Sequence, residues 1–224
     1  MRRTKLSDRK MPSYTKGEEV FNMASHIVGG ALGIVAIVLC SIFAAINGDV
    51  YGVVSGVIFG TTMLCLYTAS SVYHGLKPNT MAKRVFQVID HCMIFILIAG
   101  TYTPIALCTM RKRNTAEGWI LFGIIWALAI IGIIFNTIDL KKYKKLSMIC
   151  YLVMGWCIIV RIGALIEEVG MNAFWMLLAG GVAYTIGAVC YGLTKTKWMH
   201  SVFHVFCIVG SVLHFFFVLF YVIL

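Results

Sequence analysis

Two histidines, His200 and His204, are one helical turn apart at the beginning of the last apolar segment of the sequence. Residues i and i+4 lie on the same face of a helix, so both imidazoles can bind one metal ion. Polar side chains are costly in hydrocarbon, and a histidine pair inside a membrane segment therefore indicates a functional site. A zinc site with three protein ligands keeps one position open for chemistry, which predicts a third ligand elsewhere in the chain.

The elements that must position this pair are membrane-spanning helices. The 224 residues are 60% hydrophobic and 12% charged, and long apolar runs recur along the chain. This composition predicts an all-α membrane protein with a seven-transmembrane helix bundle. We expect a cytosolic tail at residues 1–20, too charged for a cleavable signal sequence. The membrane domain is expected at residues 21–224, with spans near 22–46, 51–75, 85–108, 118–138, 146–167, 173–193 and 199–223.

The net charge of +10 is explained by topology. The basic residues lie in short loops between apolar runs, so we expect membrane lipids as partners and no nucleic acid. With the N-terminus inside, fifteen of the 19 Lys and Arg residues fall on the cytoplasmic side. The positive-inside rule thus predicts a multi-pass protein of the cell membrane with a cytoplasmic N-terminus and, after seven spans, a C-terminus outside.

This orientation assigns a depth to each polar residue within the spans. Ser70 and His74 lie at the cytoplasmic end of the second span. Asp90 lies about 9 Å into the third span, at about 1.5 Å per helical residue. His200 and His204 lie about 5–10 Å into the last span by the same rise. All five residues are therefore expected in one layer near the cytoplasmic face.

The residue types in this layer suit a catalytic metal. His74, His200 and His204 supply three neutral imidazoles, and we expect them to hold one Zn²⁺ per chain with the fourth position open. Asp90 could accept a hydrogen bond from a water molecule at that position and act as a general base. Ser70 is one turn before His74 and could contact the water, an oxyanion or a ligand. These two residues are the catalytic candidates.

Structural roles are favoured for five further polar residues near the spans. His91 follows the candidate base and points about 100° away from it, so we expect packing rather than ligation. His214 lies about 15 Å beyond the histidine pair, where an interhelical hydrogen bond is favoured. Glu19, Asn22 and His26 enter the first span on the cytoplasmic side. Helix capping and packing are favoured for them, and a position at the mouth of the site is the alternative.

Other residues report on helix packing. Pro104 should disturb the third span, because an interior proline removes one backbone hydrogen bond. Gly29, Gly30 and Gly33 are expected to allow close approach of helices. The sequence contains no CxxC pair, so neither a disulfide framework nor a thiolate zinc site is indicated. We expect the eight cysteines to be small core residues: Cys40, Cys65, Cys92, Cys108, Cys150, Cys157, Cys190 and Cys207.

The order of these motifs resembles the hemolysin III-related and progesterone/adipoQ receptor (PAQR) family. The resemblance covers essentially the whole membrane region. Each motif alone is weak, but their order and spacing together are specific. The motifs are Glu19-Val-Phe-Asn22-Met-Ala-Ser-His26, Ser70-xxx-His74, Asp90 sixteen residues later, Gly100-Thr-Tyr-Thr-Pro104, His200-xxx-His204 and finally His214.

The resemblance implies seven helices with the N-terminus inside and a zinc ion held by His74, His200 and His204. In the adiponectin-receptor branch, the residues that match Asp90 and Ser70 lie by the metal-bound water, and ceramide hydrolysis is attributed to that site. The short tails and loops here look like the bacterial hemolysin III branch. Members of that branch are named for haemolytic activity or linked to membrane-lipid homeostasis, which implies a bacterial plasma membrane.

Three hypotheses for function follow. The leading one is a zinc-dependent hydrolase of lipid amide or ester bonds near the cytoplasmic leaflet. The second is a receptor or lipid sensor in which zinc only clamps the helices. The third is cytolysis, either direct or as an indirect consequence of lipid chemistry. The sequence contains neither the alternation of a membrane β-barrel nor a long amphipathic helix, so it does not favour a dedicated pore.

Overall fold

The computed structural model describes residues 4–9, 11–193 and 196–224, and these residues form helices and no strands. Within them, seven segments are long and apolar enough to cross a membrane: Lys16–Ile46, Val50–Gly75, Met81–Arg113, Thr115–Asp139, Lys144–Val169, Met171–Gly192 and Met199–Ile223. Each boundary lies within six residues of the predicted one. The prediction of a seven-helix membrane protein is therefore confirmed.

Three of the spans contain local changes of helix type. The simple ones are α1 (Lys16–Ile46), α2 (Val50–Gly75), α5 (Thr115–Asp139) and α8 (Met171–Gly192). The third span joins α3 (Met81–Pro104), the π-helix η2 (Ile105–Met110) and α4 (Arg111–Arg113). The fifth joins α6 (Lys144–Trp156), η3 (Cys157–Arg161) and α7 (Ile162–Val169), and the last joins α9 (Met199–Phe217) and η4 (Val218–Ile223). A short 3₁₀ turn, η1 (Leu6–Asp8), precedes them.

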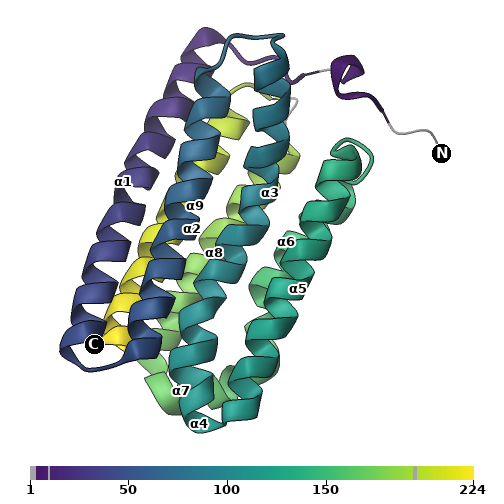
Figure 1. Cartoon of the computed structure of the whole chain (residues 1–224). Helices are drawn as coiled ribbons and strands as arrows, with labels where there is room; N and C mark the ends of the chain where they lie inside the picture. Colours follow the sequence, from purple (N-terminus) through teal and green to yellow (C-terminus); the bar gives the residue numbers. More distant parts are fainter. Residues whose placement is uncertain (1–3, 10, 194–195) are drawn as a thin grey trace.

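The helices form a bundle in which α1, α2 and α3 lie side by side, α8 and α9 lie behind them, and α5 and α6 stand beside α3 (Figure 1). The 3₁₀ turn η1 and the C-terminal turn η4 lie at opposite ends of the bundle (Figure 1). The side-chain amide of Asn47 donates to the carbonyl of Ile223 at 3.2 Å and ties the last turn to the connection between α1 and α2. The direction of the bundle in the membrane stays a prediction.

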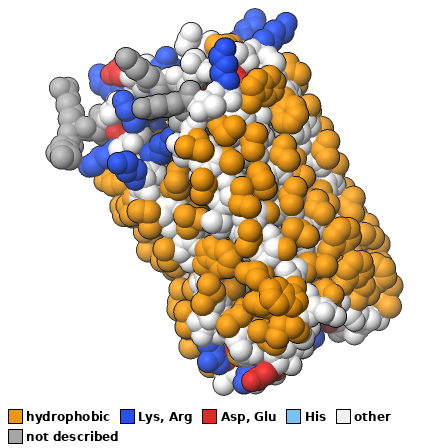
Figure 2. Space-filling view, turned by 180° about the vertical axis from the view of Figure 1, so that it is seen from behind, with side chains coloured by type: hydrophobic (Ala, Val, Ile, Leu, Met, Phe, Trp, Pro, Cys, Tyr) orange, Lys and Arg blue, Asp and Glu red, His pale blue; other side chains and the backbone are white. Residues whose placement is uncertain are grey.

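The outer surface is that of a membrane protein. On the face shown in Figure 2, hydrophobic side chains cover the length of the bundle, and charged side chains gather at its two ends. Large aliphatic residues are exposed on several helices, including Val28, Ile120 and Val189 at 63%, 59% and 60%. Such continuous apolar exposure is incompatible with water and suits lipid. The chain is a multi-pass membrane protein.

Helix α1 begins six residues before the predicted span because its first turn is capped. The Thr15 hydroxyl accepts from the Glu18 amide at 3.3 Å, and the Glu18 carboxylate accepts from the Thr15 amide at 2.8 Å. This reciprocal capping box satisfies backbone donors that have no partner within the helix. The helix therefore extends beyond the apolar run, and its charged first turn reaches the end of the bundle.

Glycines bring α1 and α2 into close contact. A Cβ atom on Gly33 would lie 2.7 Å from the backbone nitrogen of Leu64, and one on Gly60 would lie 2.5 Å from that of Ile37. A Cβ on Gly29 would lie 2.6 Å from the ring of Tyr67. Small residues of this kind let membrane helices approach closely. The predicted packing role is confirmed for Gly29 and Gly33, whereas a Cβ on Gly30 would make only ordinary contacts at 3.8 and 3.9 Å.

Pro104 marks a change in helix type, as predicted. The π-helix η2 follows it directly, and the amide of Arg111 bonds to the carbonyl of Ala106, five residues earlier. Proline cannot donate a backbone hydrogen bond, and the wider turn that follows accommodates this loss. The third span is the most enclosed of the seven and forms the centre of the bundle.

The eight cysteines are all free, as predicted. Cys40, Cys92, Cys108 and Cys207 are buried and act as small core residues. Cys65 is exposed, so the expectation of a core position is wrong for it. It lies on the outward face of α2, and hydropathy cannot distinguish that face from the inward one.

Candidate metal centre

Three histidines from two helices converge at one end of the bundle. His74 comes from the last turn of α2, and His200 and His204 come from the first turns of α9. The Nε2 atoms of His200 and His74 are 3.4 Å apart, and those of His204 and His200 are 3.1 Å apart. All three residues are buried, with 3%, 5% and 1% of their surface exposed. The structure thus brings together the three residues predicted as ligands.

This arrangement fits a metal ion. Tetrahedral zinc with Zn–N bonds near 2.0–2.1 Å separates its ligand nitrogens by about 3.3–3.4 Å. The observed separations of 3.1 and 3.4 Å are close to this value. A neutral imidazole has one N–H and one lone pair, so a ring of three converging nitrogens cannot satisfy itself with hydrogen bonds alone. The donor set and spacing suit a divalent cation that prefers imidazole nitrogen.

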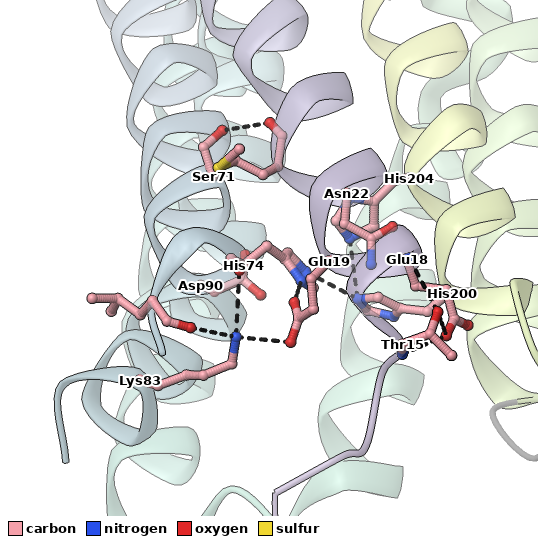
Figure 3. A network of polar contacts seen from close by, with 12 residues as sticks. Thr15, Glu18, Glu19, Asn22, Ser71, His74, Lys83, Asp90, His200 and His204 are labelled. Carbon is pink, nitrogen blue, oxygen red and sulfur yellow. Dashed lines mark hydrogen bonds and ion pairs between the residues drawn. The ribbon is translucent and has the colours of Figure 1, made fainter. Parts of the chain in front are cut away.

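The partly buried carboxylate of Glu19 holds His74. Figure 3 shows Glu19 between His74 and Lys83: its Oε2 is 2.6 Å from Nδ1 of His74, and its Oε1 is 2.8 Å from Nζ of Lys83. The capping role favoured for Glu19 from the sequence is therefore wrong. The neighbouring Glu18 caps the helix with Thr15. Glu19 is about 100° around the helix from Glu18 and faces α2.

Lys83 is a residue beside the cluster that sequence reasoning missed. It was interpreted as a loop base that sets topology, whereas only 2% of its surface is exposed. Besides Glu19, its ammonium donates to the carbonyls of Leu76 at 3.1 Å and His74 at 3.5 Å. These carbonyls lie at the end of α2, where a cation is favourable. A basic and an acidic residue at the same end of the first and third spans was the available signal for this pair.

Ser70 and Asp90 lie beside the histidine cluster. Both line a cavity that His200 and His204 also line. The hydroxyl of Ser70 is buried and has no hydrogen-bond partner among the described residues. The Asp90 carboxylate is 3.7 Å from Nδ1 of His91, and 8% of the residue surface is exposed. The predicted layer is thus present, and Asp90 faces the cavity rather than forming part of the histidine cluster.

The cavity extends from the cluster into the bundle between α3, α6, α8 and α9. Its volume is about 150 Å³, and aliphatic residues such as Leu66, Ile94 and Ile98 line it. A second cavity of about 310 Å³ continues toward the other end of the bundle. The two share six lining residues, which are Thr101, Tyr102, Gly155, Trp156, Gly181 and His214. Together they form an elongated apolar space with its polar end at the cluster.

Asn22 and His26 lie on the face of α1 that meets the cluster. The ring of His26 stacks on that of His204, with centroids 3.7 Å apart and an angle of 11°. Both ring nitrogens of His26 and both amide atoms of Asn22 are buried without a hydrogen-bond partner among the described residues. Buried polar groups are normally paired, so four such atoms leave hydrogen-bonding capacity for a ligand. His26 thus packs on the cluster, as favoured, but its two nitrogens have no partner among the described residues, and neither His26 nor Asn22 caps α1.

His91 and His214 have the structural roles that were predicted. Nδ1 of His91 is 2.8 Å from the carbonyl of Gln87, and its Nε2 is 3.0 Å from the hydroxyl of Tyr191. Nε2 of His214 donates to the carbonyl of Leu177 on α8 at 3.2 Å. Neither belongs to the histidine cluster.

The segment before α1 covers the outer side of the cluster. The ring of Tyr14 stacks on His200, with centroids 4.9 Å apart and an angle of 21°. Burial raises the pKa of the Tyr14 phenol, so it stays neutral. Farther along, the amide of Thr4 donates to Asp139 at 3.1 Å, and Arg84 donates to the carbonyl of Leu6 at 3.2 Å. Sequence reasoning gave this segment no role, because it contains no motif.

Comparison with known proteins places the chain in a family. The family described as "Haemolysin-III related" matches residues 14–215. "Hemolysin-3" of Bacillus cereus is 39% identical over 213 residues, which is 95% of each chain. "Hemolysin-3 homolog" of Bacillus subtilis (strain 168) is 38% identical over 208 residues, or 93% of this chain and 96% of the relative.

A more distant relative is human. "Monocyte to macrophage differentiation factor" of Homo sapiens is 23% identical over 187 residues, which cover 81% of this chain and 76% of the relative. The match of the family to nearly the whole chain, and two bacterial relatives well above 30% identity, agree with the motif order found in the sequence. This chain belongs to the haemolysin-III related family.

Proposed function

We propose that this protein is a zinc-dependent hydrolase of amide or ester bonds in membrane lipids. The observation that carries the proposal is the position of the histidine cluster at the polar end of an apolar cavity. His74, His200 and His204 would hold one Zn²⁺ per chain, since their nitrogens have the spacing that zinc requires. The cavity could take a hydrocarbon chain whose carbonyl end lies at the cluster.

The side chains at the cluster can manage the remaining chemistry. When bound, Zn²⁺ supplies Lewis-acid chemistry that acidifies water and polarises a carbonyl. Asp90 would take a proton from the attacking water as the water oxygen bonds to the carbonyl carbon. It would then return that proton to the amine or alkoxide as the C–N or C–O bond breaks. Ser70, whose hydroxyl has no partner among the described residues, would donate to the carbonyl oxygen.

The position of the cluster suggests where the substrate is presented. We propose that this end of the bundle faces the cytoplasm, because the bases at 77–84 and 141–145 belong to connections at the same end. The scissile bond would then lie near the inner leaflet of the bacterial cell membrane, and the enzyme would contribute to membrane-lipid homeostasis.

A receptor or lipid sensor without catalysis is the second candidate. One observation favours it: the ion-pair partner of Asp90 is His91 at 3.7 Å, so the carboxylate has no direct bond to the histidine cluster among the described residues. In that case the metal would only clamp α2 to α9. Cytolysis, which the names of the bacterial relatives suggest, would be an indirect consequence of lipid chemistry if the first candidate is correct.

Turnover separates the candidates. We expect the purified protein, with about one zinc per chain, to release fatty acid from a panel of ceramides and other amide and ester lipids. Asp90→Asn should abolish release while zinc content stays unchanged, because the carboxylate is not a ligand. Asp49→Asn, at the other end of the bundle, is the matched control and should behave like the wild type.

The negative outcomes are equally specific. If the zinc-loaded protein releases no fatty acid from any member of the panel, the hydrolase proposal is wrong and the sensor remains. Leakage of liposomes that persists after alanine replaces all three cluster histidines would show that cytolysis is independent of the metal centre.

A further inference from the structure

A pair of opposite charges, formed by the buried Lys83 and the partly buried Glu19, lies directly behind the histidine cluster. We infer that Glu19 and Lys83 are positioning residues that set the affinity of the centre for zinc through His74. Neither would contact the metal. The inference rests on the metal site of the proposed function but not on hydrolysis, so it holds for a catalytic and for a purely structural metal.

The hydrogen bond between Glu19 and His74 has only one possible direction. An ionised carboxylate only accepts hydrogen bonds, so Nδ1 of His74 must donate across the distance of 2.6 Å. The proton is then fixed on Nδ1, and Nε2 presents its lone pair toward Nε2 of His200, 3.4 Å away. A carboxylate in this position fixes the tautomer and ring orientation of a metal-ligating histidine and raises its basicity.

Lys83 holds the carboxylate of Glu19 from its other side. Its ammonium has three N–H donors and meets three oxygens, which belong to Glu19, Leu76 and His74. With 3% of its side chain exposed, it has little access to water. Lys83 therefore holds the second oxygen of Glu19 in place, and this leaves the first oxygen aimed at the imidazole. Its contact with the carbonyl of His74, at 3.5 Å, is the longest of the three, so Lys83 acts on the ligand mainly through Glu19.

A purely structural pair is the alternative, and energetics argue against it. Desolvating two charges costs about as much as their attraction returns, so buried ion pairs are weak sources of stability. Apolar residues of similar volume would join α1 to α3 at least as well. A pair that adds little to stability, yet directs one oxygen at a candidate ligand, is better explained by the site that it supports.

A double-mutant cycle on zinc affinity tests the inference. We would purify the full chain, remove metal, and measure the Kd for zinc by competition with a chromophoric chelator. Glu19→Gln keeps the shape of the side chain but removes its charge, and we expect zinc to bind about 10–100-fold more weakly. Lys83→Met keeps the length of the side chain, and we expect a loss of about tenfold. The double variant should bind no more weakly than Glu19→Gln, because Lys83 acts through Glu19.

Matched controls separate positioning from folding. Glu117→Gln removes a carboxylate that pairs with Arg161 at 2.5 and 2.8 Å near the other end of the bundle, and it should leave zinc affinity unchanged. Thermal unfolding of the metal-free variants measures any purely structural loss. Glu19→Asp should recover part of the affinity, and the visible spectrum of bound Co²⁺ should return toward that of the wild type. This variant also replaces Glu19→Gln if the latter does not fold.

Each failure points to a different conclusion. Wild-type protein that binds zinc while Glu19→Gln binds it equally tightly would overturn the inference and leave the metal site standing. A loss from Lys83→Met that persists in the Glu19→Gln background would show that Lys83 acts independently. Wild-type protein that binds no zinc would overturn the metal site together with this inference. Zinc affinities that follow the cycle in a protein without hydrolytic activity would support the inference and reject the hydrolase.

Discussion

Zinc should raise the thermal stability of this protein, and the rise should disappear when one cluster histidine is removed. The ligands come from α2 and α9. Away from the cluster, the Tyr67 hydroxyl joins these helices through Ser211 at 2.7 Å and the carbonyl of Cys207 at 3.1 Å. A metal bound by His74 and His204 would add a cross-link at the end of the bundle where the cluster lies. Unfolding must break that link, so zinc stabilises the folded state.

The size of the effect follows from mass action. A ligand that binds only the folded state stabilises it by about 2.7 kcal/mol when its free concentration is 100 times its Kd. For a chain of 150–250 residues, about 1 kcal/mol corresponds to about 2–4 °C in Tm. The expected rise is therefore about 5–10 °C. Zinc binding to thiols of the unfolded chain would lower this value.

The cysteines of the chain provide the assay. Cys40, Cys108 and Cys207 are buried, with 0%, 2% and 8% of their surface exposed. A dye that becomes fluorescent on reaction with thiols reports their exposure as the protein is heated in detergent. The shift caused by zinc is compared within each variant, so any stability lost in the metal-free state cancels. His204→Ala should show no zinc-dependent shift, whereas the control His91→Gln should retain it.

Two results would refute this reasoning. One is an equal zinc-dependent rise in wild-type protein and in His204→Ala, since the metal would then bind elsewhere. The other is no rise in the wild type at saturating zinc, since a metal held between two helices must oppose their separation.

Three further predictions concern the fold and the cavity. Gly60→Val should destabilise the bundle by about 1–3 kcal/mol, because the valine Cβ alone would lie 2.5 Å from a backbone atom of α1. Gly123→Ala is the control, since a Cβ at that position has no atom within 4 Å, and unfolding detected by thiol exposure compares the two variants. Tyr14→Ala removes the ring that stacks on His200, a contact worth about 0.5–1.5 kcal/mol, and should speed the release of zinc to a chelator up to about tenfold. Tyr14→Phe keeps the ring and should match the wild type. Gly181→Leu should fill the junction of the two cavities. It should weaken the binding of lipids about fourfold for each methylene of the lipid chain that it displaces, as measured by the Kd of lipids with different chain lengths.

The sequence predicts the helices and the depth of the polar residues well, because both depend on local composition. Apolar runs long enough to cross a bilayer identify the spans, and a rise of about 1.5 Å per residue places Ser70, His74 and Asp90 near the two histidines of the last span. Pro104 and two glycines of the first span also behave as their chemistry requires. These inferences need no knowledge of which helices are neighbours.

Rotation of each helix about its axis is what sequence reasoning could not supply. Cys65 was expected in the core and is exposed, and Lys83 was expected in a loop and is buried. In both cases hydropathy gave the correct depth, but the direction of the side chain depends on the neighbouring helices. Charge pairing can supply that missing information, since a buried cation on one span requires an acceptor at the same depth on another.

The first turn of α1 shows how much depends on that rotation. Glu18 accepts from the backbone amide of Trp198 at 2.7 Å, directly before α9 and its His200. Glu19 accepts from His74 on α2 at 2.6 Å. Adjacent helical residues point about 100° apart, so the two carboxylates hold the two helices that supply the cluster. The capping box fixes where α1 begins and therefore which carboxylate faces which helix. An N-terminal turn that contains none of the three histidines thus helps to set the geometry of their cluster.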